Sequence, residues 1–361
     1  MAAHLPGSAT ADGTHAYAAR MADLTAGGHF RRLGELRASS IGLGTYLGPA
    51  DDQTDASYRG AVVRALELGI NVIDTASNYR HQRSERAVGG ALADAVARGL
   101  VARSEVIVAS KAGFLAFDGG RPTDARAYVE RELVGAGLLE WHEVVAGCHT
   151  LAPRYLRHTI DQSRRNLGLD AIDIYYVHNP ETQLDEVTRD VFARRMRGAF
   201  EALEQACRDG AIACYGAATW SGFRVPPGHP GHLSMAELVG IARDVAGDGH
   251  HLRAVQLPYN LSMPEARALA TQRVDGAQMP ALDAAARLGL YVMSSASIEQ
   301  GKLAVRTPRG SSPGDGLQTP AQRALQYARS APGLGTALVG MKTAAHVDEN
   351  AAVARVPPIA G

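Results

Sequence analysis

The stretch Asn71-Val72-Ile73-Asp74-Thr75-Ala76-Ser77-Asn78-Tyr79 combines a short apolar run with two side chains that can take part in chemistry. The run ends in the carboxylate of Asp74, and the phenol of Tyr79 follows five residues later. Taken alone, Asp74 could cap the following helix, and Tyr79 could be a half-buried loop aromatic. A strand that brought both side chains to one rim would form a site instead of a core.

Two later apolar runs also end in a single functional side chain. Residues 106–110 lead to Lys111, and residues 172–177 lead to His178. In a (β/α)8 barrel, the carboxyl ends of different strands converge on one active-site mouth. We therefore predict an α/β fold of the TIM-barrel type, with the four side chains gathered at its mouth.

The rest of the chain alternates strand-like and helix-like segments, as expected for a parallel α/β sheet. The expected strands lie near 42–46, 71–75, 106–111, 172–178, 212–217, 254–258, 291–295 and 336–340. The expected helices lie near 55–69, 84–98, 153–167, 189–209, 234–247, 279–288, 319–330 and 344–354. Ser84 is a candidate N-cap of its helix. Residues 30–41 suggest a hairpin with Gly34 near the turn.

Three connections are too long to be simple turns: 113–150, 221–233 and 298–318. In this fold all three would lie on the mouth side, where substrate and cofactor contacts usually reside. The segment Gly42-Leu43-Gly44-Thr45-Tyr46-Leu47 lacks a third glycine and a following helix. A Rossmann site is therefore weakly supported.

Composition narrows the class of protein further. The 361 residues fit one barrel as well as two domains, and the net charge is zero. No charge block points to nucleic acid, no apolar stretch approaches a membrane span, and no signal peptide is evident. The three cysteines have no metal-ligand spacing and favour a reducing cytoplasm. We predict an N-terminal extension over 1–29, mobile or draped over the body, and a single barrel over 30–361.

The ordered set Asp74, Tyr79, Lys111 and His178 resembles the catalytic tetrad of the aldo-keto reductase superfamily. The resemblance covers about residues 30–354 and describes a divergent bacterial-type member with a long insertion, 113–150, after the third strand. Further matching motifs are Ser84-Glu85, Arg164-Arg165-Asn166-Leu167-Gly168, Val255-Gln256-Leu257-Pro258-Tyr259-Asn260 and Asp348-Glu349-Asn350.

The resemblance implies a cytoplasmic oxidoreductase that transfers hydride between a nicotinamide and a carbonyl or alcohol. The substrate would be a small aldehyde, ketone or sugar, and no metal is assigned. The implied cofactor-binding residues are Gln256 for the carboxamide, Lys342 with Thr343 for the adenosine-side phosphate, and Glu349 with Asn350 for adenine. Gln256 could instead only satisfy the barrel backbone, and Glu349 with Asn350 could be plain surface.

Several positions depart from the family pattern. Ala218-Thr219 stands where a Ser-Asn pair usually grips the carboxamide, and only Thr219 retains a side-chain hydroxyl. Ser295 stands where many members stack an aromatic ring on nicotinamide. His346 replaces an arginine that often marks a preference for the 2′-phosphate. The choice of cofactor is therefore open, with NADP(H) favoured over NAD(H).

The implied chemistry assigns one role to each member of the tetrad. Carbonyl reduction leaves negative charge on oxygen, so Tyr79 would donate a proton as that charge develops. Lys111 would lower the pKa of Tyr79 from its usual value of about 10. Asp74 would keep Lys111 charged, and neutral His178 would orient the carbonyl.

Two rival functions remain open from the sequence. One is a Schiff-base aldolase with Lys111 as nucleophile, which would leave Gln256, Glu349 and Asn350 idle. The other is a regulatory barrel that binds cofactor without turnover, which the lost Ser-Asn pair supports and the intact tetrad opposes. The insertion after Lys111 is expected to fold over the mouth, where Phe114, Phe117, Trp141 and His142 could line a pocket or pack within the loop.

Overall fold

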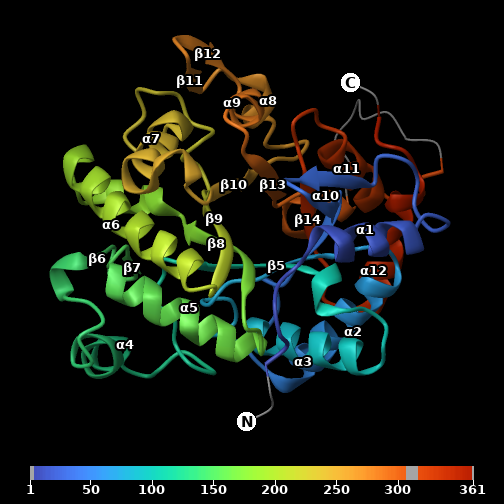
Figure 1. Cartoon of the computed structure of the whole chain (residues 1–361), viewed down its shortest axis with the longest axis horizontal. Coiled ribbons are helices and arrows are strands. Elements are labelled where there is room, and N and C mark those ends of the chain that lie inside the picture. Colours follow the sequence, from blue (N-terminus) through green and yellow to red (C-terminus); the bar gives the residue numbers. More distant parts are fainter. Residues whose placement is uncertain (1–3, 306–315, 360–361) are drawn as a thin grey trace.

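The computed structural model describes residues 4–305 and 316–359 and shows a closed barrel of parallel strands surrounded by helices (Figure 1). The order around the barrel is β10-β13-β14-β3-β4-β5-β8-β9. The barrel strands are β3 (Ile41–Gly44), β4 (Val72–Asp74), β5 (Ile107–Ala112), β8 (Ile172–His178), β9 (Ile212–Ala218), β10 (Leu252–Pro258), β13 (Tyr291–Ser295) and β14 (Thr336–Gly340). The predicted (β/α)8 barrel is confirmed.

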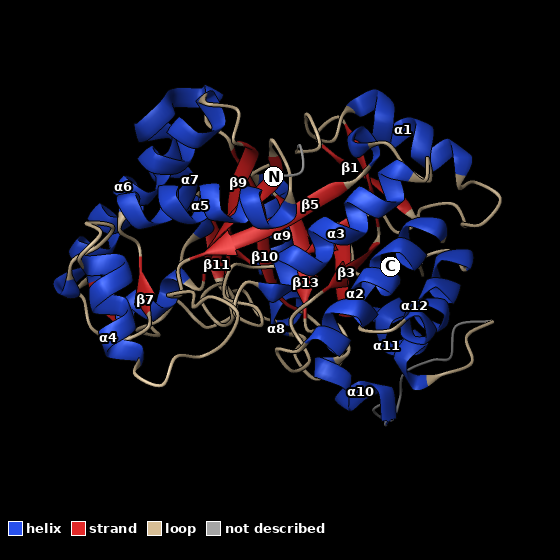
Figure 2. Ribbon diagram, turned by 90° about the horizontal axis from the view of Figure 1, so that it is seen from below, coloured by secondary structure: helices blue, strands red, loops and turns tan. Residues whose placement is uncertain are grey.

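Helices follow the strands and form the outer layer, as the view from below in Figure 2 shows. They are α2 (Asp52–Glu67), α3 (Arg83–Ala97), α5 (Pro153–Leu167), α6 (Arg189–Arg208), α7 (Met235–Ala246), α9 (Ala281–Arg287), α11 (Pro320–Arg329) and α12 (Ala344–Ala351). Within residues 4–305 and 316–359, no helix combines the length and the hydropathy of a membrane span.

The strands bury both of their faces, because helices cover the outside of the sheet and side chains fill the inside. In β4, Val72 belongs to the cluster inside the barrel, whereas Ile73 belongs to the cluster that includes the helices. A side chain on Gly216 would clash with the ring of Tyr176, so this glycine makes room for a large side chain inside the barrel.

The N-terminal segment contains a helix that sequence patterning did not predict, α1 (Ala11–Arg20). The hydroxyl of Tyr17 donates to the carbonyl of Leu66 at 2.6 Å, and the backbone N–H of Ala9 donates to Asp173 at 2.6 Å. The described part of the extension is therefore draped over the body. The predicted hairpin follows it, as β1 (Phe30–Leu33) and β2 (Leu36–Ser39).

The prediction that Ser84 caps its helix is wrong. Helix α3 begins at Arg83, its N-cap is Gln82, and no side chain caps it. The hydroxyl of Ser84 instead donates to the carbonyl of Thr45 at 2.8 Å. It joins the start of α3 to the loop that leaves β3.

The long connections carry small elements of their own. The insertion after β5 holds α4 (Ala125–Val129), β6 (Val144–Val145) and β7 (His149–Thr150). The connection after β10, which sequence analysis did not recognise as long, holds α8 (Glu265–Ala268), β11 (Gln272–Val274) and β12 (Ala277–Met279). The predicted connection 298–318 includes α10 (Lys302–Val305) and lies partly outside the described residues.

Candidate active site

Lys111 is the centre of the group of polar side chains at the mouth of the barrel. Its Nζ lies 2.6 Å from Oδ2 of Asp74, 2.8 Å from the carbonyl oxygen of Thr75 and 3.3 Å from the hydroxyl of Tyr79. An ammonium has three N–H donors, and here each one has an acceptor. The ring of Tyr79 in turn meets that of His178 edge to face at 5.8 Å. The structure thus brings the four predicted residues together.

The strand that carries Lys111 is braced by a buried carboxylate on α3. Oε1 of Glu85 accepts a hydrogen bond from Ser110 at 2.6 Å, and Oε2 accepts one from Asn166 at 2.8 Å. Because Ser110 precedes Lys111, these bonds fix the end of β5 against α3 and α5. These hydrogen bonds explain why two of the family motifs, those around Glu85 and Asn166, occur together: both brace the strand that carries Lys111.

The pKa of Tyr79 corrects one expectation. Burial raises this pKa above the ordinary value of tyrosine, and the lowering by the ammonium of Lys111 is the smaller effect. In this state of the protein, Lys111 therefore does not bring the pKa down toward neutrality. Tyr79 is a protonated phenol at neutral pH, which is the form that a proton donor needs.

Lys111 and His178 respond differently to the same buried environment. Burial lowers the pKa of Lys111, but the carboxylate of Asp74 and the hydroxyl of Tyr79 raise it by more, so it stays charged. Burial and the charge of Lys111 hold the pKa of His178 well below its usual range. His178 is thus a neutral imidazole, as expected from the sequence.

The turn after Tyr79 has an uncommon backbone conformation. Arg80, His81 and Gln82 all have positive φ, between 48° and 70°. Non-glycine residues in this region cost free energy, so surrounding contacts must hold them there. The buried guanidinium of Arg80 donates to the carbonyl of Pro49 at 2.8 Å and to the carboxylate of Asp55 at 2.5 Å. These bonds fix the segment that presents Tyr79.

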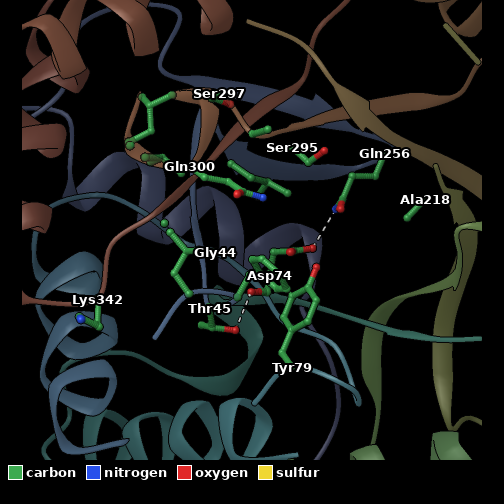
Figure 3. A pocket seen from close by; sticks show the side chains of 18 of the residues that line it. Gly44, Thr45, Asp74, Tyr79, Ala218, Gln256, Ser295, Ser297, Gln300 and Lys342 are labelled. Carbon is green, nitrogen blue, oxygen red and sulfur yellow. Dashed lines mark hydrogen bonds between the residues drawn. The ribbon is translucent and has the colours of Figure 1, made fainter. Parts of the chain in front are cut away.

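A cavity of about 780 Å³ opens at this mouth. Figure 3 shows Tyr79, Asp74 and Gln256 together at one side of it and Lys342 well away from them. Its lining also includes Ser295, His346, Glu349 and Asn350. The cavity therefore joins three of the four tetrad residues, all but the fully buried Lys111, to most of the residues predicted to hold a cofactor.

The predicted cofactor residues have different surroundings. Nε2 of Gln256 donates to Oδ1 of Asp74 at 2.8 Å, so this side chain already has a partner other than the barrel backbone. Oγ1 of Thr219 and Oδ1 of Asn350 are buried and have no hydrogen-bond partner among the described residues, although both residues line the cavity. Thr343 caps α12 by accepting from the N–H of His346 at 3.3 Å, and it does not line the cavity.

Comparison with known proteins assigns the family. Residues 40–225, just over half of the chain, match the aldo/keto reductase family model. The chain belongs to the aldo/keto reductase family. Deoxymugineic acid synthase 1 of Hordeum vulgare is 30% identical over 189 residues, which are 50% of this chain and 47% of that protein. Prostaglandin F synthase 1 of Bos taurus is 26% identical over 140 residues, 39% of this chain and 31% of that protein. The match thus spans less than half the length of these curated relatives.

Solved structures of aldo-keto reductases share the fold. One from Bacillus halodurans in its holo form superimposes with a TM-score of 0.61, at 21% identity, over 91% of this chain and 92% of its own. One from Klebsiella pneumoniae, in complex with NADP and acetate, gives a TM-score of 0.58, also at 21% identity, over 91% and 90%. At 21% identity, these similarities show only that the barrel fold is shared.

The insertion of this aldo/keto reductase family member contributes only one of its predicted aromatic residues to the cavity. Phe114 lines it, and its ring meets that of His178 edge to face at 5.1 Å. Phe117 and Trp141 pack instead against a small core of the insertion's own, around Leu133. Of the two uses considered for these aromatics, pocket lining holds for Phe114 and internal packing for Phe117 and Trp141, whereas the side chain of His142 is exposed and has neither use.

Two exposed aromatic residues at the mouth were not assigned a role from the sequence. The ring of Tyr46 lies 5.0 Å from that of Tyr79, and Tyr46 and Trp220 are about half exposed and line the cavity. Each follows the end of a barrel strand, β3 and β9. Their position close to a strand end was the available signal, as it was for Lys111 within the last residues of β5.

Proposed function

We propose that this protein reduces carbonyl groups of small aldehydes, ketones or sugars, or oxidises the corresponding alcohols, with NADP(H) or NAD(H). The observation that carries this proposal is the contact of Lys111 Nζ with both Asp74 and Tyr79 at the wall of one cavity. Family membership supports oxidoreductase chemistry in general. Family membership and the NADP-bound neighbour support a nicotinamide cofactor.

In this proposal, Tyr79 holds the proton that the substrate oxygen receives. A bound nicotinamide would supply the hydride. The charge that develops on oxygen would lie beside the Tyr79 hydroxyl, with the ammonium of Lys111 behind it at 3.3 Å. A fixed cation there stabilises the phenolate that remains after proton transfer, because the site is buried and poorly screened.

His178 and Asp74 have supporting roles in the same step. The neutral imidazole of His178 would hydrogen-bond the substrate carbonyl and orient it toward Tyr79. Asp74 keeps Lys111 charged, and Gln256 in turn holds Asp74 by its second oxygen. The carboxylate of Asp74 is thus held by Lys111 on one oxygen and by Gln256 on the other before any ligand binds.

The cavity lining fits a dinucleotide along its length. Two residues that line it, Thr219 and Asn350, each carry a buried oxygen without a described partner, and a ligand could supply one. Thr219 and Gln256 would contact the carboxamide end, with Ser295 beside the ring. Lys342 and Glu349 would lie at the adenosine end with Asn350, and Thr343, which does not line the cavity, would hold the start of α12 next to Lys342. Lys342 favours NADP(H) at that end, because its charge suits an added phosphate.

A Schiff-base aldolase is less well supported. Such an enzyme needs a neutral, accessible lysine amine. Lys111 is completely buried, its three donors are engaged, and its pKa is raised by Asp74 and Tyr79 despite its burial. The contacts within the tetrad likewise favour turnover over a purely regulatory barrel.

Binding and turnover can be tested separately. We expect NADPH and NADH titrations to quench the intrinsic fluorescence of Trp141 and Trp220, with tighter binding of NADPH. A panel of aliphatic, aromatic and sugar aldehydes then tests turnover by loss of nucleotide absorbance. If neither nucleotide binds at millimolar concentration, the reductase proposal fails, and borohydride trapping at Lys111 becomes the next test. Binding without turnover of any carbonyl would favour the regulatory barrel.

A further inference from the structure

His149 lies directly behind His178 and has no part in the function proposed so far. It is completely buried in β7, at the end of the insertion. Its Nε2 lies 2.7 Å from the backbone carbonyl oxygen of His178, the last residue of β8. The ring of Phe114 meets both imidazoles edge to face at 5.1 Å. The insertion is thus joined to the strand end that carries a tetrad residue.

The hydrogen bonds around His149 determine which ring nitrogen carries the proton. Arg195 can only donate, so its bond to Gln183 requires the amide oxygen of Gln183. The amide nitrogen then faces Nδ1 of His149 at 2.8 Å and donates to it. Nδ1 is therefore an acceptor, and Nε2 carries the hydrogen that it donates to the His178 carbonyl.

Two further features maintain this arrangement. Burial lowers the pKa of His149 to about 4, so the ring is neutral near pH 7 and keeps one donor and one acceptor. A Cβ at Gly113 would lie 2.7 Å from the carbonyl oxygen of His178 and 2.8 Å from Nε2 of His149. Only glycine leaves room at this position for the two groups to meet.

We propose that His149 is a positioning residue, which fixes the end of β8 through its bond to the His178 carbonyl and so sets the imidazole of His178 relative to Tyr79. This inference rests on the proposed reductase function. It gives insertion 113–150 a role beyond lining the cavity. Arg195 adds a second tie, because it also donates to the carbonyl of His142 in the insertion at 2.8 Å.

The bond can be broken and restored at one position. His149→Leu removes the donor, whereas His149→Gln places an amide N–H near the position of Nε2. We expect His149→Leu to lower kcat by between about 10-fold and 100-fold, since a displacement of about 1 Å at a reacting group can cost about 100-fold. His149→Gln should recover most of that loss. Cofactor affinity should change less than twofold in both, because His149 does not line the cavity.

Two other variants test the same bond from different sides. Gly113→Ala inserts a methyl group between the two partners and should reproduce the kcat loss with His149 intact. His142→Leu is the matched control, because this histidine lies in the same insertion with a side chain that is 73% exposed. It should keep the wild-type kcat. Should His149→Leu not fold, Gly113→Ala and Gln183→Met, which removes the donor to Nδ1, decide the question.

A readout that needs no turnover separates this inference from the proposed function. In ¹H–¹⁵N spectra that detect imidazole nitrogens, the His178 signals should move or split in His149→Leu and return in His149→Gln. Wild-type kcat with unmoved His178 signals in His149→Leu or Gly113→Ala would overturn the inference, even if the protein melted at a lower temperature. If the wild-type protein reduces no carbonyl at all, the proposed function fails, and the His178 signals still decide whether His149 fixes the strand end.

Discussion

The two ends of the cavity differ in whether the protein itself pairs their charged groups. At the tetrad end, Asp74 receives hydrogen bonds from both Lys111 and Gln256. At the other end, Oδ1 of Asn350 has no partner in the described part of the chain, and Lys342 forms no ion pair there. The charged groups of the tetrad are paired before any ligand arrives, whereas Oγ1 of Thr219 near the tetrad, Oδ1 of Asn350 and the ammonium of Lys342 remain available for one.

This contrast predicts which measurement each end controls. Groups already held in place can stabilise a transition state without reorganising, so changes there should appear in the rate or in stability. Groups without partners can gain bonds only from a ligand, so changes there should appear in affinity. Variants at the two ends should therefore separate kcat from cofactor binding.

The largest effect is expected at Tyr79. Tyr79→Phe removes only the phenolic oxygen, so the ring keeps its packing against Tyr46 and His178. General acid catalysis is typically worth about 10²–10⁴-fold, so the hydride step should slow by at least about 100-fold. Stopped-flow absorbance measures this step. Cofactor affinity should be unchanged, and the fold should be kept with only a small fall in melting temperature, because one donor of Lys111 loses its acceptor. Hydride transfer near the wild-type rate would refute the role of Tyr79.

A change at Lys111 should cost both turnover and stability, unlike one at Tyr79. Lys111→Met leaves the carboxylate of Asp74 buried without its cation, and breaking a buried pair typically costs about 3–5 kcal/mol of unfolding free energy. Urea denaturation measures that cost. Lys302→Met is the matched control, because the Lys302 side chain is 75% exposed. Equal stability of the two variants would mean that the Lys111–Asp74 pair contributes nothing net.

The sequence predicted the barrel and the tetrad because both depend on local patterns. Each barrel strand is an apolar run with clear ends, and the functional side chains stand at those ends. The contact of Gln256 with Asp74 spans 182 residues, and the bond of His149 to His178 depends on the path of an insertion. Neither of these two contacts leaves a periodic pattern in the sequence. Helix α1 was missed because it buries only Thr14 and Tyr17 and so has no repeating apolar face, and Ser84 was misassigned because its hydroxyl bonds outside its own helix.

A smaller effect is expected at the other end of the cavity. Asn350→Leu removes an amide whose oxygen has no partner, so the protein without cofactor should be no less stable. Loss of one ligand hydrogen bond, worth about 1 kcal/mol, should raise the Kd for NADPH by about fivefold. Fluorescence titration measures the Kd, and kcat at saturating NADPH should be unchanged. A fall in kcat with an unchanged Kd would contradict the division between the two ends.

The smallest effect is expected of pH on the rate of reduction, because the tetrad is already in the protonation state that reduction needs. Reduction requires Tyr79 protonated and His178 neutral. Burial raises the pKa of Tyr79, so its proton is retained up to and beyond the ordinary tyrosine value of about 10. Burial and Lys111 hold the pKa of His178 well below its usual range, so this ring is neutral above it. The rate of the hydride step in reduction, at saturating cofactor, should therefore be flat from about pH 6.5 to 9 and fall only at higher pH.

In the same range, alcohol oxidation should accelerate as pH rises, because it needs Tyr79 without its proton. Stopped-flow measurements of reduction and of oxidation over a pH series test both expected dependences. A reduction rate that began to fall near neutral pH would show that, once the cofactor is bound, Lys111 lowers the pKa of Tyr79 by more than burial raises it.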